Sequence, residues 1–187
     1  HPDIAAHYAG GYNAVSTSTL PMDDHGHGTH VAGTIGAIQD GKGVVGVAPN
    51  AKLYAVKVLD ANGSGSYSNV LAGIQWAADN KMSVINMSLG GSQGTPALAA
   101  VMEAAEKAGV TIICAAGNDS GPVNFPAKYP QAVAISASSS ADKIAGFSSR
   151  GPEIAFIAPG VNVYSSYKGG AYKTMSGTSM ACPHVAG

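Results

Sequence analysis

Strand-length apolar segments alternate with helix-length segments through the middle of the chain, and this alternation is the strongest constraint on the fold. Apolar runs typical of buried strands lie at 51–59, 83–87 and 110–116, and residues 70–80 have apolar side chains at helical spacing. Chains that alternate in this way form a parallel sheet covered by helices. We therefore predict an α/β fold, with a mostly parallel central sheet and helices on both faces.

The ends of one helix are marked clearly. Thr95 and Pro96 provide an N-cap and a proline at the first helical position, and Gly109 fits the position after the last turn. This pattern predicts a helix up to about Ala108. Residues 1–24 are polar and contain a glycine pair, so we expect a loop there. Shorter strands are expected at the following ranges: 133–137, 154–157, 161–165 and 171–174.

The composition excludes several classes of function. The chain has 187 residues, long enough for one domain with a sizeable core, and we expect a single domain over residues 1–187. Charged residues make up only 11% and the net charge is −1, without a basic cluster, so nothing indicates nucleic-acid binding. The apolar runs are far too short to span a membrane, so we expect no membrane association.

The two cysteines, Cys114 and Cys182, lie in apolar surroundings, and their spacing fits neither a metal pair nor a CxxC motif. We expect two buried thiols, with a disulfide as the alternative, because free cysteine is among the most buried residue types.

Ser179 follows Gly177 and Thr178 and precedes a short apolar run that predicts a helix, with Thr178 as its possible N-cap. A serine at this place is either an ordinary helix start or a nucleophile. A nucleophilic serine needs a base such as histidine, and the oxyanion it produces needs hydrogen-bond donors. His27 and Asn118, at the ends of other predicted elements, would supply the base and a donor if the fold brought them together.

Other interpretations of these residues are weaker. His25, His27 and His30 are candidate zinc ligands, but HExxH is absent and no further ligand is evident. Ser179 does not fit the nucleophile motif G-x-S-x-G, since Ala181 takes the last position. His30 and His184 are expected to be internally hydrogen-bonded histidines.

Six segments together resemble the subtilisin-like serine proteases, most closely the secreted bacterial members. They occur in the family's order and cover practically the whole chain: 27–34, 46–49, 88–91, 115–118, 147–152 and 177–181. The resemblance implies the three-layer fold of that family and a serine endopeptidase that forms an acyl-enzyme. His27 is then the general base, Ser179 the nucleophile, and Asn118 an oxyanion donor beside the backbone N–H of Ser179.

The resemblance also implies binding sites. The pocket for the residue before the scissile bond has small walls, which predicts a broad specificity with a preference for large apolar residues; these walls are Ser88, Leu89, Gly90, Ala115, Ala116 and Gly117. Tyr67 and Val70 would line a second apolar pocket, and Gly63 and Gly65 would pair with the peptide substrate as a strand edge. A structural calcium ion is implied, bound by the side chains of Asp3 and Asp40 and by carbonyls of Ile38, Lys42 and Val44.

One departure from the family limits this interpretation. The family's acid stands in an Asp-[Ser/Thr]-Gly motif shortly before the segment that opens this chain at His1, and no aspartate here stands in such a motif. We therefore interpret the chain as an internal fragment, truncated at both ends, that lacks the triad acid and is inactive by itself. The alternative is a non-catalytic, peptide-binding relative.

The resemblance further predicts a secreted bacterial monomer that acts on protein or peptide substrates. It also predicts a pro-region that serves as inhibitor and folding aid.

Overall fold

The computed structural model describes residues 1–187, which divide into two compact units. Unit 1 comprises His1–Ala77, Tyr164–Lys173 and Gly187, and unit 2 comprises Ala78–Val163 and Thr174–Ala186. The single catalytic domain expected from the sequence stays a prediction.

Unit 1 contains a parallel pair of strands, β1 (Tyr8–Asn13) and β2 (Leu53–Lys57). Its helices are α1 (Pro2–Ala5), α2 (His27–Gly36) and α3 (Tyr67–Asp79), the last of which extends into unit 2 by its final residues. Most of strands β7 (Val163–Tyr167) and β8 (Ala171–Met175), with the short 3₁₀ turn η1 (Lys168–Gly170) between them, also belongs to this unit.

The expectation of a loop over residues 1–24 is wrong, because α1 and β1 lie within it. Strand β1 has the sequence YAGGYN, and its glycines have low strand propensity. Pairing with β2 overrides that propensity. A Cβ on Gly11 would lie 1.9 Å from the carbonyl oxygen of Ala55, so the two backbones approach more closely than any side chain allows.

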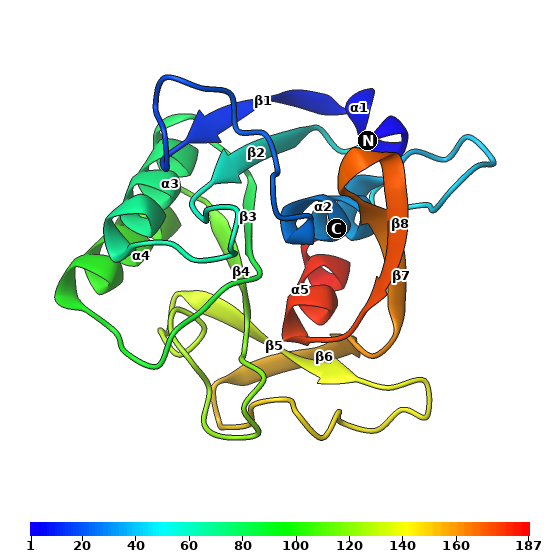
Figure 1. Ribbon diagram of the computed structural model, residues 1–187. Helices are drawn as coiled ribbons and strands as arrows, with labels where there is room; N and C mark the ends of the chain where they lie inside the picture. The colour runs from blue at the N-terminus through cyan, green and yellow to red at the C-terminus, as the bar shows by residue number, and fades with distance from the viewer. The chain divides into compact units, whose positions relative to one another are not determined.

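Unit 2 contains a parallel sheet in the order β3-β4-β5-β6, formed by Val84–Met87, Thr111–Ala115, Ala132–Ser138 and Ile154–Pro159. Helix α4 (Pro96–Lys107) packs against β4, and α5 (Thr178–Ala186) packs against all four strands from the other side of the sheet (Figure 1). The predicted α/β fold, with a parallel sheet and helices on both faces, is confirmed.

The boundaries of α4 follow from local chemistry, as predicted. The hydroxyl of Thr95 accepts a hydrogen bond from the Leu98 N–H at 3.1 Å, Pro96 is the first helical residue, and Gly109 has a φ of 89°. The helix buries Leu98, Met102 and Ala105. On the other side of the sheet, the core joins alternate residues of β4 and β5 to two residues of α5: Ile113, Ala115, Ile135, Ala137, Ala181 and Cys182.

Candidate functional site

Ser179 is the second residue of α5, half-buried, and two hydrogen bonds attach it to the end of β3. Its hydroxyl donates to the carbonyl oxygen of Ser88 at 3.2 Å, and the hydroxyl of Ser88 donates to the carbonyl oxygen of Ser179 at 2.8 Å. Ser88 is itself buried. The start of α5 is therefore fixed to the carboxyl end of a sheet strand, the place where α/β proteins bind ligands.

Asn118 lies beside the same helix start, although it is distant in sequence. Its side-chain oxygen accepts hydrogen bonds from the backbone N–H of Thr178 at 2.7 Å and from the hydroxyl of Thr178 at 2.9 Å. Because the oxygen of the amide is held by these two donors, the orientation of the amide is set, and its NH₂ group remains to donate elsewhere. Asn118 is exposed, so this donor is accessible to a ligand.

Thr178 does not have the capping role that its sequence position suggested. It is the first residue of α5 and completely buried, and its hydroxyl accepts from the Gly117 N–H at 3.1 Å while donating to Asn118. The hydroxyl thus joins the 115–118 segment to α5 instead of capping its own helix. The interpretation of Thr178 as an N-cap is wrong for this reason.

The two predicted walls of the specificity pocket are joined to neighbouring residues, one wall to Asn124 directly and the other to Phe125 through the adjacent Gly91. Gly91, next to the predicted wall residues Ser88, Leu89 and Gly90, exchanges backbone hydrogen bonds with Phe125, and Asn124 donates to the carbonyl of Ala116. The second wall consists of Ala115 and Ala116, both buried, and Gly117, whose φ is 116°. A Cβ on Gly117 would lie 2.5 Å from the Asn124 amide nitrogen. Both walls are therefore rigidly placed within unit 2.

His27 belongs to unit 1, where it is the first residue of α2. Partial burial lowers the pKa of His27, the neighbouring His25 lowers it further, and the charge of Asp23 opposes both effects. The imidazole is therefore a neutral base at neutral pH. The pairing of His27 with Ser179 stays a prediction, since each is described within its own unit.

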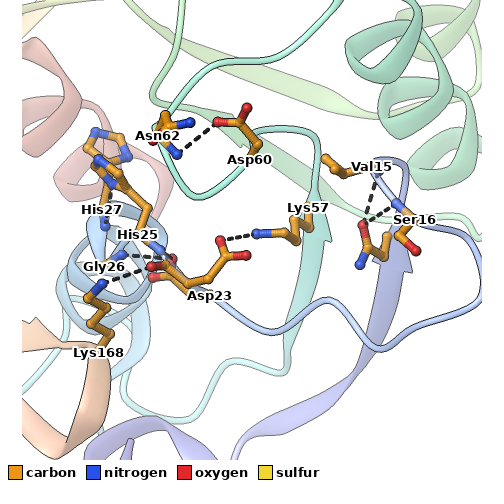
Figure 2. A network of polar contacts seen from close by, with 12 residues as sticks. Val15, Ser16, Asp23, His25, Gly26, His27, Lys57, Asp60, Asn62 and Lys168 are labelled. Carbon is orange, nitrogen blue, oxygen red and sulfur yellow. Dashed lines mark hydrogen bonds and ion pairs between the residues drawn. The ribbon is translucent and has the colours of Figure 1, made fainter.

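A strap of four consecutive residues, 165–168, holds the backbone around His27. The hydroxyls of Ser165 and Ser166 donate to the carbonyls of His30 at 2.8 Å and Thr29 at 3.0 Å. The hydroxyl of Tyr167 donates to the carbonyl of His25 at 3.1 Å. The ammonium of Lys168, labelled in Figure 2, donates to the carbonyl of Asp24 at 2.8 Å. No local pattern in the sequence predicts this strap, because its bonds join residues far apart in the chain.

The strap also packs closely against α2 and the residue before it. A Cβ on Gly26 would lie 2.3 Å from the ring of Tyr167, and one on Gly33 would lie 2.1 Å from the hydroxyl of Ser166. His30 is completely buried, and its Nε2 hydrogen-bonds the carbonyl of Lys173 at 2.9 Å. His184 bonds the carbonyl of Met180 at 2.8 Å. The prediction that His30 and His184 are internally hydrogen-bonded is confirmed.

The predicted strand edge of the substrate site lies in a turn organised by Asp60. Its carboxylate accepts from the N–H groups of Asn62 and Ser64, and Gly63 adopts a φ of 75° (Figure 2). A Cβ on Gly65 would lie 2.2 Å from the carbonyl oxygen of Val58. Tyr67 and Val70 stand in the first turn of α3, where Tyr67 is 41% exposed and Val70 is half-buried. Their role in substrate binding stays a prediction.

The predicted calcium ligands also lie in unit 1. Asp3 is buried, and its carboxylate accepts hydrogen bonds from the Val44 N–H at 3.0 Å and from the Tyr172 hydroxyl at 2.8 Å. The backbone carbonyl of Asp3 accepts from the Ile38 N–H at 2.8 Å. The bond to Asp3 raises the pKa of Tyr172 to about 12. Asp40 is exposed and accepts from the Lys42 N–H. The loop over 38–44 therefore folds onto Asp3, and the binding of calcium by these residues stays a prediction.

No group of three or more histidine, cysteine, aspartate or glutamate side chains in the structure could hold a metal ion. Cys114 and Cys182 are both free and buried, so the expectation of two buried thiols is confirmed. Burial raises the pKa of Cys182 to about 12 and raises that of Cys114 well above its usual value. No helix in the structure has the length and apolarity needed to cross a membrane.

Comparisons with known proteins agree with these features. The family described as Peptidase_S8, the subtilase family, matches residues 1–187. Subtilisin from Bacillus pumilus is 50% identical over 100% of this chain and 70% of its own length. A thermostable alkaline protease from Halalkalibacterium halodurans is 51% identical over 100% of this chain and 52% of its own length. Subtilisin E from Bacillus subtilis is 50% identical over 100% of this chain and 50% of its own length.

Among solved structures, a cold-adapted subtilisin-like serine proteinase matches with a TM-score of 0.93 and 41% identity, over 100% of this chain and 68% of that one.

Proposed function

Because this chain belongs to the subtilase family, we propose that it is part of a serine endopeptidase that cleaves peptide bonds through an acyl-enzyme. Ser179 is the nucleophile, His27 the general base, and Asn118 an oxyanion donor. The observation that carries this proposal is the orientation of the Asn118 amide. Two bonds from Thr178 hold its oxygen, so its NH₂ group is available beside the residue that precedes Ser179.

The mechanism assigns each group one task. His27 accepts the proton of the Ser179 hydroxyl as that oxygen attacks the carbonyl carbon of the substrate, and it returns the proton to the leaving amine. The Asn118 amide and the backbone N–H of Ser179 donate to the oxyanion, where the positive end of the α5 dipole adds to the stabilisation. Water then attacks the acyl-enzyme by the same proton transfers in reverse.

We propose that the acid that orients His27 lies in a preceding segment of a longer enzyme. The chain spans 70% of one curated relative and about half of two others, and none of its aspartates stands in the family's Asp-[Ser/Thr]-Gly motif. The 187 residues alone are then inactive, because a base without its orienting acid loses most of its effect.

The proposed substrate is a protein or peptide with a large apolar residue before the scissile bond. The walls that support this assignment are small residues, Ser88 and Gly90 on one side and Ala115 to Gly117 on the other. Gly63 and Gly65 would pair with the substrate backbone, and Tyr67 with Val70 would hold a second apolar side chain.

Calcium is the proposed structural ion. Asp3 and Asp40, with the carbonyls of Ile38, Lys42 and Val44, would hold it, and its chemistry there is to bind the 38–44 loop to Asp3 without entering catalysis. We further propose a monomeric, secreted bacterial enzyme made with a pro-region; its similarity to enzymes of Bacillus supports this.

A fluorophosphonate probe, which labels activated serines, tests the proposal on the longer protein. We expect labelling of the wild type and of the control Ser140→Ala, at an exposed serine, and none of Ser179→Ala. Labelling that survives Ser179→Ala would overturn the assignment. A wild type that resists labelling, yet binds peptides, would favour the non-catalytic alternative.

A further inference from the structure

The segment that leads into α2 has its backbone donors gathered by one carboxylate. Asp23 Oδ1 accepts from the N–H groups of His25 at 3.0 Å and Gly26 at 2.8 Å, and Oδ2 accepts from Thr29 through its N–H at 2.8 Å and its hydroxyl at 2.7 Å. These four bonds lie on both sides of His27, and Figure 2 shows those to His25 and Gly26. Asp23 thus closes the entry to the helix like an extended N-cap.

The carboxylate is suited to this position electrostatically. Partial burial pushes the pKa of Asp23 upward, but the hydrogen bonds from Gly26, Thr29 and His25 outweigh it and lower the pKa overall. Asp23 is therefore ionised at any pH at which a histidine base works. A negative charge at the start of a helix also interacts favourably with the helix dipole.

His27 is held from both sides of its backbone. Asp23 binds the N–H groups before and after it, and the 165–168 strap binds carbonyls before and after it. The backbone N–H of His27 itself donates a hydrogen bond to Nδ1 of His25 at 3.3 Å. Because the backbone of residues 25–29 is fixed, the direction of the His27 Cα–Cβ bond is fixed too, and a helical backbone disfavours one of the three χ1 rotamers of the imidazole.

We propose that Asp23 is a positioning residue for the base His27, one that orders the 23–29 segment so that the imidazole is presented in a single direction. This proposal rests on the proposed function, in which His27 takes the proton of the nucleophile. The adjacent Asp24 has no such role: it is exposed, and its carboxylate pairs with Lys57.

The experiment compares Asp23→Asn with Asp24→Asn in the longer enzyme, with turnover normalised to titrated active sites. A small misplacement of a reacting group costs up to about 100-fold in rate, so we expect Asp23→Asn to lower kcat by roughly 10- to 100-fold. KM is expected to change by less than about twofold, as for an interaction that acts in the transition state. Asp24→Asn should leave both values within about twofold of wild type.

The pH profile separates positioning from simple stabilisation. Of the three ionisable side chains that act on the pKa of His27, namely His25, Asp23 and His30, only Asp23 raises it, so Asp23→Asn should move the acid limb of kcat/KM to lower pH. A variant that only melts earlier, with unchanged kcat and an unmoved acid limb, would overturn the proposal.

Thr29 offers a second test if Asp23→Asn does not fold. Thr29→Val removes one donor to Asp23, and Thr29→Ser keeps it. We expect a several-fold loss of kcat in the valine variant and recovery in the serine variant; equal values would contradict the proposal.

Histidine NMR gives a readout that does not depend on activity. The His27 ring signal should shift or broaden in Asp23→Asn and stay unchanged in Asp24→Asn; an unchanged signal in both overturns the positioning role. Failure of the proposed function is seen separately, as a wild type that fluorophosphonate does not label.

Discussion

Replacing Thr178 by valine should weaken unit 2 at the point where the start of α5 is attached to the 115–118 segment. The hydroxyl of Thr178, completely buried, accepts from the Gly117 N–H at 3.1 Å and donates to the Asn118 oxygen at 2.9 Å. Valine has the same shape as threonine, but its side chain can neither accept nor donate a hydrogen bond. Asn118 keeps its bond from the Thr178 N–H, whereas the Gly117 N–H loses its acceptor.

The magnitude follows from two opposing contributions. A donor left without its acceptor in a buried place costs about 1–3 kcal/mol, and the added methyl group contributes about 0.8 kcal/mol of burial. The net loss is about 1.2 kcal/mol, which lowers Tm by about 2–5 °C for a domain of this size. The assay is thermal unfolding of the longer protein at one scan rate, in a Ser179→Ala background that prevents self-cleavage.

Thr111→Val is the matched control. Thr111 is exposed at the start of β4, so the same substitution there should change the stability by less than about 0.5 kcal/mol. If both variants melt within about 1 °C of each other, the expected difference in stability is absent. The hydroxyl of Thr178 then does not support Gly117 and Asn118, and the reasoning is refuted.

Three further predictions concern titration, thiols and calcium. The lowered pKa of His27 keeps the base neutral to lower pH, so the acid limb of kcat/KM should lie below about pH 6.5; a limb above that value would contradict the assignment of the base. Cys114 and Cys182 should resist a thiol reagent in the native protein and react fully in denaturant, since both are buried with raised pKa values. Calcium at a hundredfold excess over Kd should stabilise the protein by about 2.7 kcal/mol, and Asp40→Asn, unlike Asp142→Asn, should abolish that gain in thermal unfolding.

The sequence predicted those elements whose signals are local. Helix α4 is bounded by Thr95, Pro96 and Gly109, which act within one turn of the helix ends, and the buried run of β4 needs no partner to be recognised. Strand β1 was missed because it depends on a partner: Gly10 and Gly11 oppose strand formation until β2 lies beside them.

The candidate site was predicted unevenly for the same reason. Motifs identified Ser179, Asn118 and His27, but the bonds that hold them come from residues without a motif. Thr178 was taken for a cap because its contact with Asn118 spans 60 residues. Asp23 had a local signal, an acid shortly before a helix start, that could have identified it as a capping residue.

The strap has a consequence for the order in which the protein is made. Its four bonds join residues separated by 135, 137, 142 and 144 positions, so the ribosome must add that many residues before the carbonyls of the His27 segment meet their donors. At 5–20 residues per second, the delay is roughly 7–29 s. During synthesis the hydrogen bonds around His27 therefore form late, and a nascent chain that already carries His27 cannot yet hold this residue in place.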